Sequence, residues 1–317
     1  MRSQRPQGIG LSLRETLPIE RLRSVAQALD RDKGVTLWLP EFALRESVGQ
    51  LAYLAACTEQ LGLANGVASM AARTPVASAL AAATLEDLSS GRAVLGLGVS
   101  HPTMSAGWHG QTHESALGWA AEYLDVVRQV LDGEETDLGG RELRSHGFRL
   151  LDGARPDVPI ILAALGPKML ELGARRADGV LLNWTTPEYA RDSVERVGAA
   201  AAAAGRPTPA VGAYVRIATG PDATEQARAH ADFYTQLPAY RRSLLRMGFT
   251  DGDSLSADAA EALILQGDAE QIVDHVQAWL AAGIDPLVLY PIGDGPAVEQ
   301  SIELGVEVVH RLAGQRA

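Results

Sequence analysis

Short apolar runs alternate with amphipathic segments along almost the whole chain. Gly, Pro or charged residues flank the runs, as is typical of buried strands, and the segments between them repeat apolar residues at helical spacing. The predicted strands are residues 8–13, 35–39, 63–68, 93–97, 160–164, 180–182, 211–217 and 286–290. The predicted helices are residues 18–32, 47–61, 75–88, 116–131, 167–176, 188–204, 268–282 and 298–312. Strands connected through helices lie parallel, with right-handed crossovers.

The number of β–α repeats predicts a closed barrel. Eight repeats define a (β/α)8 TIM barrel, and a chain of 317 residues is long enough for that fold with insertions. No Gly-x-Gly-x-x-Gly follows the first strand, which argues against a Rossmann domain. No change in composition marks a linker, so we predict one α/β domain over residues 1–317. Its expected insertions are about 98–114, rich in Gly, His and Trp, 132–158, whose Gly139-Gly140 indicates a β-hairpin, and 222–266, mostly helical.

Composition narrows the classes of function. The net charge of −11 argues against a nucleic-acid partner, because binding phosphates requires clustered Lys and Arg. No segment offers ~20 consecutive apolar residues and the N-terminus has no long apolar region, so we expect a cytoplasmic protein without a membrane partner. The single cysteine, Cys57, cannot form an intramolecular disulfide. We interpret it as a core thiol of helix 47–61, for which Ser47 is the expected N-cap.

The segment 159–183 carries the clearest chemical signal. A buried strand is followed at once by Gly166 and Pro167, and then by a helix. Gly166 is expected to permit a tight turn, and Pro167 suits the first helical position. The free N–H groups of Lys168 and Met169, with the Lys168 side chain, would then form an anion site at the helix N-terminus. A phosphate-bearing cofactor is the expected ligand, and an ordinary βα turn that binds nothing is the alternative.

In a (β/α)8 barrel the active site lies at the carboxyl ends of the strands. The residues that end or follow the predicted strands are Glu41 and Phe42, 68–73, 99–108, 165–168, Asn183 and Trp184, Arg216, and Tyr290 and Pro291. We predict no metal site, because His109 and His113 lie four residues apart without an HExxH pattern. No GxSxG elbow and no Ser–His–Asp order is present.

Three segments, in this order along the chain, resemble the luciferase-like monooxygenase class of oxidoreductases, and most closely its coenzyme F420-dependent branch. The first is GVASMAARTP, where the resemblance implies a cis peptide between Gly66 and Val67 behind the deazaflavin ring. The second is SGRAVLGLGVSHP, where it implies that Ser100 contacts the ring and that His101 is catalytic. The third is ILAALGPKMLELGARRADGVLLN, and Asn183 at its end is a further expected cofactor contact. In this third segment the resemblance implies that the Gly-Pro turn and the amides after it hold the phosphate. The cofactor-binding residues that it implies are Ala163, Ala164, Leu165, Gly166, Pro167 and Lys168.

The chain departs from this family at one position. After the second strand many relatives read Pro-Asp-His or Pro-Glu-His, whereas this chain reads Pro40-Glu41-Phe42. Glu41 keeps the acidic position and is the second catalytic candidate, or a hydrogen-bond partner of the ring or of a neighbour. The first candidate for proton transfer is His101, because histidine ordinarily titrates near a pKa of about 6.5.

The resemblance implies hydride transfer between coenzyme F420 and a small organic substrate, in a homodimer. An FMN-dependent luciferase-like monooxygenase is the alternative within the class. A non-catalytic cofactor-binding barrel is the alternative of another class, because a fold does not guarantee activity.

Overall fold

Eight parallel strands close into a barrel in the computed structural model, which describes residues 8–14, 17–43, 45–250 and 255–316. Each strand pairs with the next, and the last pairs with the first, so the barrel has no free edge. In order around the barrel they are β1 (Ile9–Ser12), β2 (Val35–Leu39), β3 (Gly62–Asn65), β5 (Ala93–Gly98), β8 (Ile160–Ala163), β9 (Gly179–Asn183), β10 (Ala210–Ala218) and β12 (Leu287–Pro291). The predicted barrel is therefore confirmed, strand by strand.

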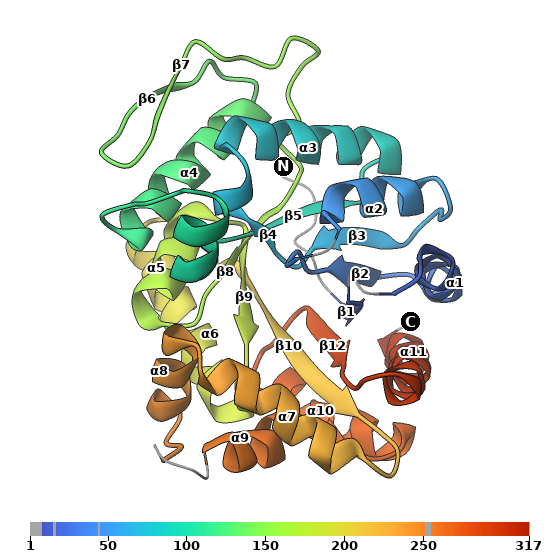
Figure 1. The fold of residues 1–317 in the computed structure, drawn as a ribbon. Helices are drawn as coiled ribbons and strands as arrows, with labels where there is room; N and C mark the ends of the chain where they lie inside the picture. Colours follow the sequence, from blue (N-terminus) through green and yellow to red (C-terminus); the bar gives the residue numbers. More distant parts are fainter. Residues whose placement is uncertain (1–7, 15–16, 44, 251–254, 317) are drawn as a thin grey trace.

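Helices follow the barrel strands in sequence and cover their outer faces (Figure 1). They are α1 (Ile19–Leu29), α2 (Ser47–Ala55), α3 (Pro75–Ser89), α4 (Ala116–Leu131), α5 (Pro167–Arg176), α6 (Pro187–Ala203), α10 (Ala269–Ala281) and α11 (Pro296–Arg316). Side chains alternate along each strand between the helix-facing core and the barrel interior. On β10, Val215 and Ile217 join the helix-facing core, whereas Tyr214 joins the cluster inside the barrel. Arg216, two residues beyond Tyr214, therefore lies on the inward face.

The start and end of α2 correct two predictions. Glu46, not Ser47, caps the helix, because the Glu46 carboxylate accepts hydrogen bonds from the Val48 and Gly49 N–H groups. Ser47 is buried instead, and its hydroxyl accepts a hydrogen bond of 2.5 Å from Asn65 Nδ2. The helix ends at Ala55, well before residue 61. Cys57 consequently lies beyond the helix and is partly exposed, so its interpretation as a core thiol was wrong.

The three insertions all contain secondary structure. Segment 132–158 forms the predicted hairpin of β6 (Asp137–Gly139) and β7 (Arg144–His146), which projects beyond α3 and α4 at the top of Figure 1. Segment 98–114, rich in Gly, His and Trp, contains a π-helix, η2 (Thr103–Trp108). Segment 222–266 holds α7 (Ala223–Thr235), α8 (Pro238–Arg246), α9 (Leu255–Leu263) and β11 (Ile264–Gln266), which extends the sheet beside the end of β10.

A short excursion follows β3, where the chain forms β4 (Ala68–Ser69) and a 3₁₀ turn, η1 (Met70–Ala72). β4 pairs with the end of β5 and so brings the chain back to the barrel wall. In the part of the chain that the structure describes, no helix combines the length and the apolarity that crossing a membrane requires.

Candidate active site at the carboxyl ends of the barrel strands

The end of β3 forms a bulge inside the barrel. The Gly66–Val67 peptide bond is cis, which confirms the prediction for this pair. Gly66 N–H donates to Leu39 O at 2.8 Å, and Tyr214 Oη donates to Gly66 O at 2.5 Å from the opposite wall. A Cβ on Gly66 would lie 1.8 Å from Tyr214 Oη, so only glycine fits. Val67, unlike Gly66, is partly exposed.

The bulge lies beside the end of β8. A Cβ added to Gly98, the last residue of β5, would lie 2.7 Å from Val67 Cγ2 and 3.5 Å from Ala163 Cβ. Val67 and Ala163 therefore border the same point of the barrel mouth, as expected for two residues of one cofactor site. Ala164 is buried, and its N–H donates to Leu181 O at 3.1 Å.

The turn between β8 and α5 has the predicted sequence of elements but a different reason for its glycine. Pro167 is the first helical residue, as predicted. Gly166 has φ −138° and ψ 162°, an extended conformation open to any residue, so conformational freedom does not explain it. Met169 N–H donates to Gly166 O at 3.0 Å and is not free, in contrast to the prediction. The first amides of a helix have no helical partner unless a 3₁₀-type bond such as that of Met169 forms. This leaves the Lys168 N–H as the amide that points out of the helix N-terminus.

A second cation lies at this turn and was missed by sequence reasoning. Arg246, the last residue of α8, places Nη1 3.3 Å from the position that a Cβ on Gly166 would take. Arg246 and Lys168 are both exposed, and neither forms an ion pair with another residue in the described ranges. Leu165 O accepts hydrogen bonds from Tyr189 Oη at 3.2 Å and Ser243 Oγ at 3.1 Å, which fix the turn against α6 and α8. We call residues 163–168 the phosphate turn.

The end of β9 leaves two buried polar atoms without partners. Asn183 Nδ2 donates to Tyr240 Oη at 3.0 Å, but Asn183 Oδ1 has no partner among the described residues. Trp184 Nε1 next to it is likewise buried and unpaired, and Trp184 adopts a left-handed φ of 53°. Buried polar atoms are normally hydrogen-bonded, so a site with two unpaired atoms fits a polar ligand that supplies the partners.

Glu41 is engaged by the protein itself. Arg73 donates to both carboxylate oxygens, at 2.5 and 2.7 Å, and the Ser47 and Ser69 N–H groups donate at 3.1 and 3.2 Å. Burial alone would raise the pKa of Glu41, but the hydrogen bonds and charge of Arg73 and the two amides outweigh it, so the pKa lies below its ordinary value. Glu41 is therefore ionised at neutral pH and holds the ends of β2 and β4 together.

Ser100 and His101 leave the end of β5. Ser100 has a left-handed φ of 66°, and its hydroxyl contacts Met104 Sδ at 3.7 Å. His101 is partly buried, and its Nδ1 accepts a hydrogen bond from Thr103 N–H at 3.3 Å. The neutral ring consequently carries its proton on Nε2 and can donate it there. No hydrogen bond among the described residues joins His101 or Glu41 to the phosphate turn.

Arg216 occupies the inward face of β10 and has no acidic partner among the residues that the structure describes. Its side chain is 1% exposed and lies over three aromatic rings, with Cζ 4.1 Å from the centroid of Trp184, 5.0 Å from Tyr234 and 5.2 Å from Tyr290. Arg216 Nε donates to His230 Nε2 at 3.1 Å. Burial, followed by the charges of Arg216 and Arg14, lowers the pKa of His230 to about 2. We call these five residues, Arg216, Trp184, His230, Tyr234 and Tyr290, the arginine cage.

Three aromatic side chains from three different connections meet near these residues. Phe42, which follows β2, lies 5.5 Å from Trp108 of η2 and 6.5 Å from Phe233 of α7, measured between ring centroids. Each is about half exposed. Sequence reasoning singled out Phe42 and Trp108 separately, but nothing in the local pattern indicated that α7 would join them.

Comparison with known proteins identifies the family. The sequence model of a family described as luciferase-like monooxygenase matches residues 5–286. The match extends over most of the 317 residues, and the chain belongs to the luciferase-like monooxygenase family.

Individual proteins resemble this chain in sequence or in fold. A Mycobacterium tuberculosis protein, described as a proposed coenzyme F420-dependent oxidoreductase, is 30% identical over 291 residues, covering 75% of this chain and 81% of its own length. The 5,10-methylenetetrahydromethanopterin reductase of Archaeoglobus fulgidus is 29% identical over 297 residues, covering 84% and 88%. The structure of the coenzyme F420-dependent tetrahydromethanopterin reductase of Methanopyrus kandleri superposes with a TM-score of 0.77 at 22% identity, covering 96% and 99%.

Proposed function

We propose that this protein is a coenzyme F420-dependent oxidoreductase that transfers a hydride between the deazaflavin and a small organic substrate. The observation that carries the proposal is the phosphate turn, where the Lys168 amide, the Lys168 side chain and Arg246 present positive charge without an acidic partner among the described residues. The positive end of the α5 dipole adds to this charge. The two relatives reported by sequence identity, one of them named for F420 and the other a reductase, support the same cofactor and reaction class.

The residues further along the barrel mouth suit the ring of the cofactor. Ala163 and the Gly66–Val67 bulge, which border the same point of the barrel mouth, would hold the ring, because Ala163 and Gly66 are small enough to let a flat group approach the backbone. Asn183 Oδ1 and Trp184 Nε1, both buried and unpaired, would exchange hydrogen bonds with the polar edge of such a ring. Ser100 would contact the ring from the end of β5.

The reduced deazaflavin, when bound, supplies the hydride, and this chain supplies the binding, the exclusion of water and a proton. A substrate that gains a hydride at a polarised double bond must also gain a proton. His101 Nε2–H is our proposed donor. Glu41 stays ionised in its contact with Arg73 and acts as a positioning residue for the loop that it closes.

A side-by-side titration tests the proposed cofactor. Purified protein is titrated with F420 and with FMN, and binding is followed by quenching of intrinsic tryptophan fluorescence. Tight binding of F420 and weak binding of FMN are expected. The reverse order would overturn the proposal in favour of an FMN-dependent monooxygenase, the alternative that the family's own name favours. Yellow protein with flavin absorption after purification would point the same way.

The non-catalytic alternative is favoured by one feature, the replacement of the usual histidine after the second strand by Phe42. A panel of carbonyl, imine and enone compounds, assayed with reduced F420 near ~420 nm, separates the two possibilities. Oxidation of F420 by any member supports an enzyme. Tight cofactor binding with no turnover by any member would support a binding protein.

The resemblance also leads us to propose a cytoplasmic homodimer. Size-exclusion chromatography with light scattering is expected to give twice the mass of one 33.6 kDa chain, and the mass of a single chain would reject the dimer.

A further inference from the structure

The charge of Arg216, which no described carboxylate pairs, is the feature of the barrel that the proposed function does not explain. Arginine stays protonated at all physiological pH values, so burial cannot neutralise it. A buried charge is costly unless it is paired. Among the described residues no carboxylate forms an ion pair with Arg216, and its Nη2 is buried without any hydrogen-bond partner. The aromatic faces of the arginine cage lower the cost of burial but do not cancel the charge.

His230, the hydrogen-bond partner of Arg216 within the described residues, supplies no negative charge. His230 accepts the Nε hydrogen bond, and the pKa of His230 of about 2 means that its ring is neutral. The charges that act on His230, those of Arg216 and Arg14, are both positive. His230 therefore does nothing to neutralise Arg216.

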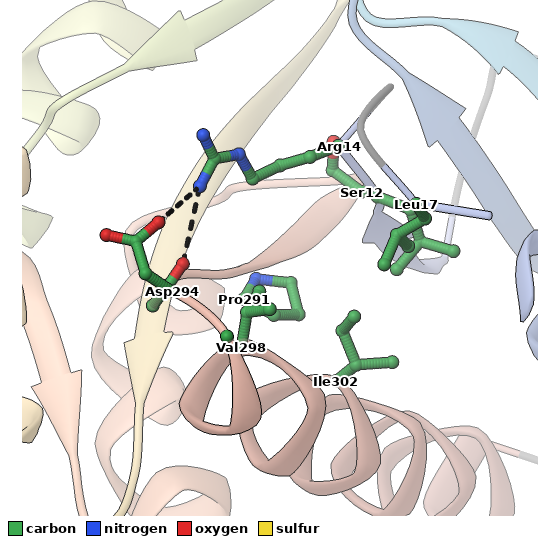
Figure 2. A pocket seen from close by; sticks show the side chains of 10 residues that line it. Ser12, Arg14, Leu17, Pro291, Asp294, Val298 and Ile302 are labelled. Carbon is green, nitrogen blue, oxygen red and sulfur yellow. Dashed lines mark hydrogen bonds and ion pairs between the residues drawn. The ribbon is translucent and has the colours of Figure 1, made fainter.

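Arg14, the other arginine near His230, differs from Arg216 because its charge is paired with a carboxylate. It follows β1, is partly exposed, and reaches Asp294 at 3.6 Å and Gly293 O at 3.3 Å (Figure 2). This pair lines a small pocket of about 190 Å³ between the end of β1 and α11. Arg216 has no equivalent of Asp294 in the described residues, although it is far more buried.

Arg216 also lies on the barrel wall where a substrate is expected, opposite the bulge at Gly66–Val67. Its neighbour on the same face, Tyr214, reaches across the interior to Gly66 O, so the bulge and Arg216 lie on opposite walls. If the proposed function holds, a ring backed by the bulge on β3 turns its free face toward β10. Of the cage residues, His230 and Tyr234 of α7 are partly exposed whereas Arg216, Trp184 and Tyr290 are buried, so α7 forms the side of the cage nearest to solvent.

We propose that Arg216 is the specificity residue for a monoanionic substrate, and that its Nη2 binds the substrate's carboxylate within the arginine cage. That the bound anion is a substrate rests on the proposed function. That Arg216 binds an anion does not. A carboxylate carries one charge and matches the one charge of Arg216. A phosphate, with nearly two charges at neutral pH, would leave excess negative charge buried beside aromatic rings.

Calorimetric titration of the cofactor-free protein with hexanoate tests the site, and hexanamide, of the same shape without the charge, is the control ligand. Hexanoate is expected to bind and hexanamide to bind at least tenfold more weakly. Arg216→Met should lose hexanoate binding at least tenfold, Arg216→Lys should retain part of it, and Arg14→Met, which removes the compensated arginine, should retain it fully. Equal binding of the two ligands, or full binding by Arg216→Met, would overturn the proposal. Inorganic phosphate that binds more tightly than hexanoate, and whose binding Arg216→Met but not Arg246→Gln weakens, would overturn it as well.

Thermal stability separates a ligand site from a structural role for Arg216. Replacing an unpaired buried charge by an apolar side chain of similar size is neutral or stabilising. Arg216→Met without ligand is therefore expected to melt at the parent temperature or above it. A clear fall in melting temperature in both Arg216→Met and Arg216→Lys would assign Arg216 to the fold and reject the proposal.

A last experiment distinguishes failure of this inference from failure of the proposed function. Hexanoate titration is repeated at saturating F420, and binding is expected to persist. Competition between hexanoate and F420 would assign the cage to the cofactor and overturn the substrate proposal. Failure of F420 to bind at all would reject the proposed function while leaving the cofactor-free hexanoate result to stand or fall by itself.

Discussion

The phosphate turn and the arginine cage lie on different walls of one barrel mouth, and they differ in how the sequence encodes them. The phosphate turn is continuous, since residues 163–168 form it and α8 only adds Arg246. The cage is assembled from the ends of β9, β10 and β12 and from α7, which lies in an insertion. A short local pattern reveals the first, and only the folded chain reveals the second.

The electrostatic state of the two sites differs as well. At the phosphate turn Lys168 and Arg246 are exposed, so water screens their charges and the unliganded site is inexpensive. In the cage Arg216 is buried, so the missing anion is costly. We infer that the cage is selected for ligand binding at the expense of stability, as is common for functional sites. The predictions below test this contrast, beginning with the largest expected effect.

Substitution of His101 tests the proposed proton donor and is expected to give the largest effect. Glu41 is held ionised by Arg73, the Tyr214 hydroxyl donates its hydrogen bond to Gly66 O, and the pKa of His230 is about 2. We therefore propose His101 as the proton donor. His101→Ala is expected to lower turnover about 10²-fold, the usual contribution of general acid–base catalysis, with little change in F420 affinity. Single-turnover oxidation of reduced F420 by a substrate from the panel measures the rate.

His101→Gln serves as the matched variant, because it keeps hydrogen bonding without acidity. It should be as slow as His101→Ala. Near-parental rates in either variant, with chemistry rate-limiting, would remove His101 from the mechanism.

Gly166 tests the phosphate turn. Its extended backbone accepts a β-branched residue, so Gly166→Val should fold, but the new Cβ would lie 3.3 Å from Arg246 Nη1 and fill the space meant for an anion. F420 affinity is expected to fall at least tenfold, about 1.4 kcal/mol. Fluorescence titration measures it, with Gly198→Val on the outer helix α6 as the control. Unchanged affinity in folded Gly166→Val would separate this turn from the cofactor site.

The sequence predicted those features that depend on neighbours along the chain. Hydrophobic periodicity located all eight barrel strands, and the Gly-Pro pair placed Pro167 at the first turn of α5. The family resemblance placed the cis peptide at Gly66–Val67. The prediction was wrong where a tertiary contact decided the outcome. Ser47 gave up capping because its hydroxyl pairs with Asn65, and Glu46 took over.

Features formed across the fold carried no local signal. Arg246 and Phe233 lie in the helical insertion 222–266, and no spacing in that segment indicates which barrel strands they would approach. Arg216 was identified as the residue at the end of a strand, which is correct, but its isolation from every described carboxylate is a property of the packed structure. A missing partner cannot be recognised before the surroundings are known.

The pH dependence of protein stability tests whether the arginine cage is closed to water. Burial and the charges of Arg216 and Arg14 lower the pKa of His230 from 6.5 to about 2. Below pH 6.5 the unfolded chain therefore binds a proton that the folded protein does not, so stability falls as the pH falls. His230→Gln keeps an acceptor for Arg216 Nε but cannot titrate. When the pH falls from 7.5 to 5.5, the unfolding free energy of the parent is expected to decrease. The decrease should be about 1 kcal/mol larger in the parent than in His230→Gln.

Urea denaturation of both proteins at the two pH values gives this difference. The same loss in parent and variant would show that His230 titrates normally and that the cage is open to water.

Arg246 should give the smallest effect, because its charge is exposed and water competes for it. Arg246→Gln removes the charge but keeps a donor near Gly166, and we expect F420 affinity to fall only about threefold, or roughly 0.6 kcal/mol. Added salt should weaken F420 binding to the parent more than to Arg246→Gln, since a screened charge contributes less at high ionic strength. Arg242→Gln, an exposed arginine one turn earlier in α8, is the matched control and should bind like the parent. Equal salt dependence in the parent and Arg246→Gln would mean that the cofactor phosphate does not sense Arg246, and that the anion is held by the α5 N-terminus and Lys168 alone.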